Sequence, residues 1–239
     1  MTRGQFWLTL LCVALVGLGA MWVSGRQSLV AGHGPARSLD AVRLGPDPGQ
    51  PVAAYLAALP ARLPPPGARP VPALVQLDGE ITGPDAATLF AGAGVASAVL
   101  RVPLARVQTA LRFQPMPPVS TADPVEALRR RFSTATQDAA RAAAAQAARL
   151  TGRPALVARY EAGVLGQAPA CRCVLAVLVL ADRATLDRLA AHPGVRAVDA
   201  APEGTPVTGV ALAPLLPEQT VAATPAPDDG PVPPTPGAP

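Results

Sequence analysis

A continuous apolar run and the pattern that follows it predict the core of this chain. Residues Cys173–Leu180 are almost entirely Val, Leu and Ala, which is typical of a short strand buried on both faces. A helix is predicted next from an N-cap, two leucines at helical spacing and a Pro-Gly stop, namely Asp182, Leu186, Leu189 and Pro193-Gly194. Residues Val195–Asp199 then alternate as a second short strand does. The stretch from Arg172 to Asp199 therefore predicts a β-α-β unit.

A second stretch has the same organisation. It comprises a predicted strand, helix and strand at Ala73–Leu77, Gly83–Phe90 and Ala98–Leu104. The two predicted helices begin alike, since the letters DAATL at Asp85–Leu89 match DRATL at Asp182–Leu186. We therefore expect an α/β (α+β) domain in which the two β-α-β units form a split, ferredoxin-like arrangement.

The longest predicted helix, 124–150, is inserted between the two units. Asp123 is a suitable N-cap, and Glu126 completes a capping box. The apolar stripe is strong at Phe132 and consists only of Ala further along, so a helix docked on the domain is favoured over a coiled-coil dimer. Two further apolar stretches are expected to form a strand and an edge strand or flap, respectively: Ala155–Ala162 and Val207–Leu216.

An uncharged apolar stretch, Phe6–Val23, precedes all of these elements. Its 18 residues are at the lower limit for crossing a bilayer, and Trp7 and Trp22 stand near its ends, where interface aromatics are found. We expect one N-terminal transmembrane helix, although a signal peptide cleaved near Val23-Ser24-Gly25 would give a similar pattern. Arg3 precedes the stretch and three Arg residues follow it, so a strict count of positive charges does not favour an outside C-terminus. We expect an extracytoplasmic C-terminal domain, because long domains are translocated largely regardless of charge.

Clusters of Pro divide the rest of the chain, since such clusters cannot lie inside regular structure. The expected organisation is a transmembrane anchor, a Pro-rich linker, an α/β domain and a disordered Pro-rich tail, at residues 1–24, 25–72, 73–216 and 217–239. Pro-rich segments are semi-rigid, so the linker is expected to hold the domain away from the membrane.

The composition and the distribution of charge bear on the kind of partner that is expected. The net charge is +4 and all 20 basic residues are Arg, but they are scattered along the chain without interleaved aromatics. A nucleic-acid partner is therefore not expected. Since only 3% of the residues are aromatic, core packing must depend on Val, Leu and Ala.

The sequence contains few residues that carry chemistry. We find no nucleophile elbow, phosphate loop, dinucleotide fingerprint or zinc-protease motif. His33 lies in the predicted linker, and His192 is expected to cap a helix. Cys12 falls in the apolar stretch. Cys171 and Cys173 lack further metal ligands nearby. They are small buried apolar residues or, in an extracytoplasmic domain, a strained redox pair or the site of an intermolecular bridge. We predict no catalytic, cofactor-binding or metal-binding residue and a protein that is not an enzyme.

The segment Val179–Asp199, with the letters LDRL and HPGVRAV, resembles the last β-α-β unit of subtilisin-propeptide-like (inhibitor I9) domains. The resemblance covers about 20 residues. It implies a ferredoxin-like fold that binds a protease through its sheet and a C-terminal extension, here Ala201–Thr208. Two functions follow as expectations. The first is a membrane-anchored, extracytoplasmic, non-catalytic module that binds another envelope or secreted protein. The alternative is a propeptide-like inhibitor of a subtilisin-type serine protease.

Overall fold

The computed structural model describes residues 41–117 and 123–236. The predicted transmembrane stretch Phe6–Val23 lies outside these residues, as do Cys12 and His33. Within the described residues, no helix is both long enough and apolar enough to cross a membrane.

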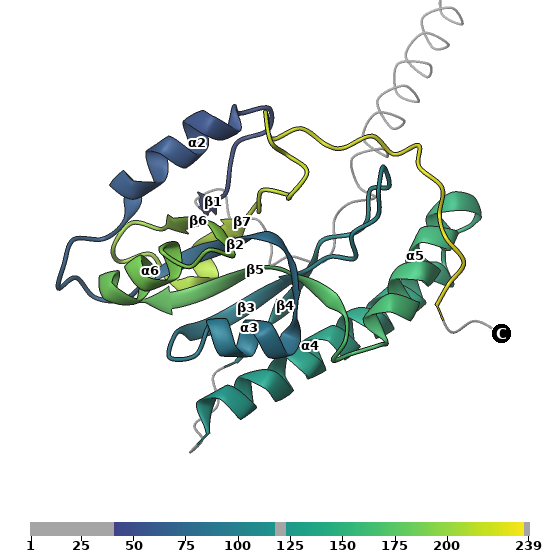
Figure 1. Cartoon of the computed structure of the whole chain (residues 1–239), viewed down its shortest axis with the longest axis horizontal. Helices are drawn as coiled ribbons and strands as arrows, with labels where there is room; N and C mark the ends of the chain where they lie inside the picture. Colours follow the sequence, from purple (N-terminus) through teal and green to yellow (C-terminus); the bar gives the residue numbers. More distant parts are fainter. Residues whose placement is uncertain (1–40, 118–122, 237–239) are drawn as a thin grey trace, which may run out of the picture. The chain divides into compact units, whose positions relative to one another are not determined.

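Five strands form one antiparallel sheet in the order β4-β3-β5-β2-β6 (Figure 1). In chain order, their bounds are β2 Val71–Thr82, β3 Gly94–Leu100, β4 Arg112–Pro115, β5 Arg172–Ala181 and β6 Val195–Ala200. The strand β5 lies at the centre of the sheet, and the side chains of Val174–Val179 are buried. A strand covered on both faces was the prediction from its continuous apolar run, and it is confirmed.

The two predicted β-α-β units are present and share this sheet. The first contains helix α3, Gly83–Leu89, between β2 and β3, and the second contains helix α6, Arg183–Ala190, between β5 and β6. The units interleave, because β5 lies between β2 and β3 while β2 lies between β5 and β6. Both helices have side-chain N-caps: Thr82 accepts a hydrogen bond from the Asp85 N–H, and Asp182 accepts one from the Thr185 N–H at 2.9 Å.

One face of the sheet packs against helices. Val177 and Val179 of β5 share a core with Leu186 and Leu189 of α6. Helix α4, Pro124–Ala147, adds Phe132 to the same core, and helix α3 adds Ala86 and Ala87. The apolar side chains of these helices recur about every 3.6 residues and so lie on one face of each helix. That face packs against the side of the sheet to which alternate residues of β5 point.

The opposite face is covered by segments from both ends of the described chain (Figure 1). Strand β1, Val42–Leu44, pairs in parallel with β7, Val210–Leu212, which follows the short 3-10 helix η3, Val207–Gly209. Leu44 and Val210 share a second core with Leu74, Val99 and Leu178 of the sheet. Helix α2, Val52–Ala58, and the 3-10 helix η2, Leu59–Arg62, continue this layer and bury Val52, Tyr55 and Leu59 against Ala197 and Leu215. We call residues 41–63 and 207–216 the covering layer.

The covering layer changes the environment predicted for Leu178. The sequence pattern predicts that Leu178 is buried, and its exposed fraction of 3% confirms this. The expectation that Leu178 packs against the helix that carries Leu186 and Leu189 is wrong, because Leu178 belongs to the core under the covering layer. Neighbouring residues of a strand point to opposite faces, so Val177 and Val179 contact the helices instead.

The long predicted helix is present as α4 and continues into a second helix. The Asp123 carboxylate accepts a hydrogen bond from the Glu126 N–H at 3.0 Å, as the predicted N-cap requires. The predicted strand Ala155–Ala162 is wrong, because these residues lie in helix α5, Gly152–Leu165, which packs against α4. The buried residues of α5 recur at helical spacing, at Ala155, Ala158, Glu161 and Leu165.

The Pro-rich segments on either side of the predicted domain also differ from expectation. Residues 41–70 belong to the folded unit rather than to a spacer, because Leu44, Val52, Tyr55 and Leu59 are buried. Residues 217–236 follow the surface of the domain rather than forming a disordered tail. Ala222 bridges to Pro51, and Asp228 and Asp229 pair with Arg153 and Arg106. Pro51 has an extended backbone conformation, and the next residue, Val52, is buried.

Candidate functional site

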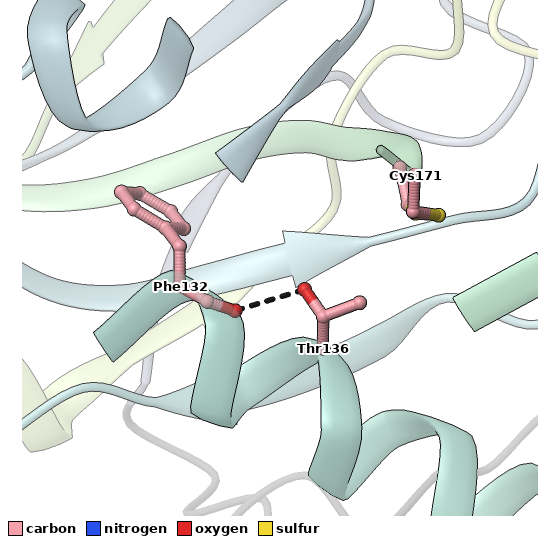
Figure 2. Close-up of a disulfide and its surroundings, with 4 residues drawn as sticks. Phe132, Thr136 and Cys171 are labelled. Carbon is pink, nitrogen blue, oxygen red and sulfur yellow. Dashed lines mark hydrogen bonds between the residues drawn. A yellow bond between two sulfur atoms is a disulfide. The ribbon is translucent and has the colours of Figure 1, made fainter. Parts of the chain in front are cut away.

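The cysteine pair is the first candidate that the sequence offers. Cys171 immediately precedes β5 and Cys173 lies within it, and their sulfur atoms are bonded as a disulfide with the Cα atoms 5.4 Å apart. Figure 2 shows Cys171 near Phe132 and Thr136 of α4, where the Thr136 hydroxyl donates a hydrogen bond of 2.8 Å to the Phe132 carbonyl. Both cysteines are buried in the core between the sheet and the helices. The structure therefore combines the two interpretations of the sequence, since the pair is both buried and bonded.

His192 occupies the turn after α6, as predicted. Its Nδ1 accepts a hydrogen bond of 3.1 Å from the Gly194 N–H, and its backbone N–H donates to the Leu189 carbonyl. The side chain is exposed, and among the described residues no acidic or nucleophilic side chain is bonded to it. These contacts are those of a turn residue that ends a helix.

The segment Ala201–Thr208, which the resemblance makes the extension that enters a protease, is held at both ends. Ala201 is buried and its N–H donates to the Pro72 carbonyl at 2.8 Å. The Thr205 N–H donates to the Pro202 carbonyl at 3.2 Å, and Gly204 has a φ of +85°, which closes a turn. The chain then enters η3 and β7 of the covering layer. This segment is a short connection within the fold.

A buried polar cluster that the sequence pattern did not reveal lies beneath the covering layer. Asp199 of β6 is fully buried. Its Oδ2 accepts hydrogen bonds from the Gly45 N–H at 2.7 Å and from the Tyr55 hydroxyl at 2.9 Å, and its Oδ1 accepts one from Arg62 Nη1 at 3.0 Å. Each contact joins β6 to a different part of residues 41–63. We call Gly45, Tyr55, Arg62, Gln76, Asp199 and Leu215 the Asp199 cluster.

Gln76 extends the cluster to the other covering segment. Its Nε2 donates to the Tyr55 hydroxyl at 2.7 Å, and its Oε1 accepts from the Leu215 N–H at 2.6 Å. Burial, followed by the negative charge of Asp199, raises the pKa of the Tyr55 phenol well above its usual range. The phenol therefore remains a neutral donor at physiological pH.

Glycine is required at one point of the cluster. Gly45 has a φ of +120°, and a Cβ atom there would lie 1.8 Å from the Ala213 carbonyl oxygen. The close approach of these backbones allows the Gly45 N–H to reach Asp199, while the Ala213 N–H donates to the Leu44 carbonyl at 2.8 Å.

A second buried charge cluster ties residues 217–236 to the sheet. Arg101 follows β3, and its side chain is 5% exposed. It donates to Glu80 of β2 at 3.2 Å and to both carboxylate oxygens of Glu218 at 2.8 and 2.5 Å. A buried guanidinium needs such partners, because an unpaired charge in this position is strongly destabilising.

A third buried pair joins the helices to the edge of the sheet. Glu161 of α5 is 2% exposed and pairs with Arg112 of β4. Its Oε1 also accepts a hydrogen bond of 2.7 Å from the Ala110 N–H. The acid is thus fully engaged in holding α5 beside β4.

Two shallow grooves are present at the surface. One, of about 170 Å³, lies between η2 and β6 and is lined by Leu59, Leu63 and Val198 among others. The other, of about 260 Å³, lies between the end of β4 and α4 and is lined by Met116, Arg130 and Arg131 among others. Burial lowers the pKa of Arg131, whose guanidinium donates to the Val95 and Met116 carbonyls. Over the described ranges, no three His, Cys, Asp or Glu side chains come together as metal ligands.

Comparison with protein-family models, curated proteins and solved structures finds no match to this chain. The resemblance of Val179–Asp199 to subtilisin-propeptide-like domains thus remains a prediction.

Proposed function

We propose that this chain is a membrane-anchored, extracytoplasmic, non-catalytic module with a ferredoxin-like domain that binds another envelope or secreted protein. The observation that supports a non-catalytic role most directly is that buried ionisable groups form their bonds within the fold. Asp199, Arg101 and Glu161 are each bonded to partners within the fold. Groups that perform acid-base or nucleophilic chemistry instead face a pocket that can admit a substrate.

Neither of the two grooves described above favours a small substrate. Their volumes of about 170 and 260 Å³ are below the range of about 300–1,000 Å³ that is usual for ligand pockets. A protein partner needs no deep cavity, because it binds through a broad surface with a few anchoring side chains.

The anchor rests on the uncharged stretch Phe6–Val23. The folded unit begins by residue 42 rather than near residue 73, so residues 24–40 connect the proposed membrane span to the domain. A chain of that length reaches at most about 60 Å when fully extended. The proposed partner would therefore lie close to the membrane surface.

Two measurements test the proposal in the full-length protein. Carbonate extraction of membranes should leave the protein in the pellet, and a protease added outside spheroplasts should digest the domain. Mature protein that begins near Arg26 and is recovered in the soluble fraction would overturn the anchor. A domain digested only after the cells are opened would overturn the extracytoplasmic location.

The alternative function, protease inhibition, requires particular surfaces of the fold to be accessible. An inhibitor that binds a protease through its sheet and the segment Ala201–Thr208 would need both to be accessible. The covering layer buries Leu74 and Leu178 on the sheet face opposite the helices, so the sheet does not meet this requirement, whereas most of Ala201–Thr208 is exposed. Affinity purification from detergent-solubilised membranes separates the two functions, because the inhibitor requires a subtilisin-type protease among the captured proteins.

A further inference from the structure

The Cys171–Cys173 disulfide closes a loop with a single intervening residue. Loop-closure entropy grows with loop length, so a bond across the shortest loops restrains the unfolded chain least. The bond therefore contributes little to the stability of the domain. Its position at the start of the central strand requires another explanation.

The strand is held in place without the bond. Arg172 pairs with Thr82 of β2, and Val174 pairs with both Ile81 of β2 and Leu100 of β3. The Cys173 carbonyl also accepts a hydrogen bond of 2.8 Å from the Arg101 N–H. Opening the disulfide would leave these contacts intact, so the domain can pass between the two oxidation states while folded.

Both cysteines are buried, and Cys171 is the less completely buried residue of the two. Cys171 is 7% exposed and lies just outside β5, whereas Cys173 is 1% exposed and lies within it. The preceding turn contains the exposed residues Gln167, Pro169 and Ala170. A movement of this turn would uncover Cys171 first, because Cys171 precedes β5 whereas the Cys173 carbonyl is held by the Arg101 N–H.

We propose that Cys171 and Cys173 form a reversible thiol–disulfide exchange site that reacts with the dithiol of an external protein. A thiolate of that dithiol attacks the Cys171 Sγ atom, the bond to Cys173 breaks, and the Cys173 sulfur leaves with the electron pair and takes up a proton. The second external thiol then loses its proton and attacks the external sulfur of the mixed disulfide, which releases Cys171 to take up that proton. Two electrons reduce the pair, and the external dithiol becomes a disulfide. This site goes beyond the proposed binding function and does not depend on it.

Redox cycling of the folded full-length chain in detergent tests the site. Dithiothreitol serves as the dithiol, and free thiols are counted by the gel shift of a polyethylene-glycol maleimide after acid quenching and denaturation. A Cys12→Ser background removes the remaining cysteine of the three. We expect two thiols to appear in the folded protein at a rate within about tenfold of that in urea, because exchange needs access to sulfur rather than unfolding. Oxidised glutathione should then restore the bond. Reduction that occurs only in urea would overturn the proposal.

The single variants form a matched pair that tests the point of attack. Cys173→Ser leaves Cys171 free, and Cys171→Ser leaves the more buried Cys173 free. With oxidised glutathione, Cys173→Ser should form its mixed disulfide at least about tenfold faster than Cys171→Ser, because the rate depends on access to the thiol. Mass spectrometry measures both rates. Equal rates, or faster reaction of Cys173, would overturn the assignment of Cys171. Circular dichroism identifies a variant that fails to fold, in which case the cycling of the unmodified pair decides.

Discussion

Tyr55→Phe removes one hydroxyl from the Asp199 cluster and keeps the aromatic ring. The hydroxyl donates to Asp199 at 2.9 Å and accepts from Gln76 at 2.7 Å, and the whole residue is buried. A hydrogen bond to a charged group contributes about 1.5–3 kcal/mol, and a buried donor left without a partner costs about 1–3 kcal/mol. Because the ring still fills its space, no cavity term is added. We expect the free energy of unfolding to fall by about 2–4 kcal/mol.

The assay is urea unfolding of the full-length protein in detergent, followed by far-ultraviolet circular dichroism. Tyr160→Phe is the matched control, since Tyr160 is partly buried and its hydroxyl makes no hydrogen bond in the described part of the chain. The control should change stability by about 0.5 kcal/mol or less. Equal effects of the two substitutions would refute the argument that the cluster holds the covering layer on the sheet.

Alkaline pH provides an independent check on Tyr55. Its folded pKa is raised by burial and by the charge of Asp199, so the folded state favours the protonated phenol. The contribution of Tyr55 to stability is therefore fully present below the unfolded value of 10.0 and is lost as the pH rises above it. Stability measured above pH 10 should fall less steeply in Tyr55→Phe than in the unmodified protein.

Three further substitutions test other parts of the fold. Leu178→Ala should lower the free energy of unfolding, measured in urea, by about 2–5 kcal/mol through lost burial and the cavity left under the covering layer. A smaller change would mean that the layer collapses to fill the space. Glu218→Ala should lower stability by about 1–3 kcal/mol, because Arg101 loses two charged hydrogen bonds, and an unchanged unfolding curve would show that residues 217–236 do not restrain the domain. The pKa of Asp182 is lowered by its hydrogen bonds from Thr185, so its contribution is present above the unfolded value of 3.8 and is lost as the pH falls below it. Asp182→Asn should therefore flatten the acid limb of the stability profile measured between pH 5 and 2, and an unaltered limb would contradict this role.

The elements that the sequence predicted correctly are those specified by local patterns. The β5-α6-β6 unit has a continuous apolar run, a capping Asp182 and leucines at helical spacing, all within the 28 residues from Arg172 to Asp199. Such signals depend on near neighbours along the chain. The start of α4 at Asp123 was predictable for the same reason.

The errors arose where local and tertiary information conflict. The letters ALVARYEA of α5 are compatible with either a strand or a helix, and contact with α4 decides for the helix. The Pro-rich segment before β2 lacks periodicity, yet its residues Leu44, Val52 and Leu59 are buried. Asp199 resembles any polar residue near the end of a strand, and its partners Gly45, Tyr55 and Arg62 lie 154, 144 and 137 positions away. No local pattern identifies a contact of that range.

The covering layer also allows the two functions to be distinguished by one substitution. If the chain were an inhibitor that acts through the sheet, the layer would have to leave the face that contains Leu74 and Leu178 before the protease could bind. Tyr55→Phe, which loosens the layer, should then strengthen inhibition of a subtilisin-type protease relative to Tyr160→Phe. The proposed module is not a protease inhibitor, so neither variant should inhibit hydrolysis of a chromogenic peptide. Stronger inhibition by Tyr55→Phe alone would therefore reject the proposed function in favour of the alternative.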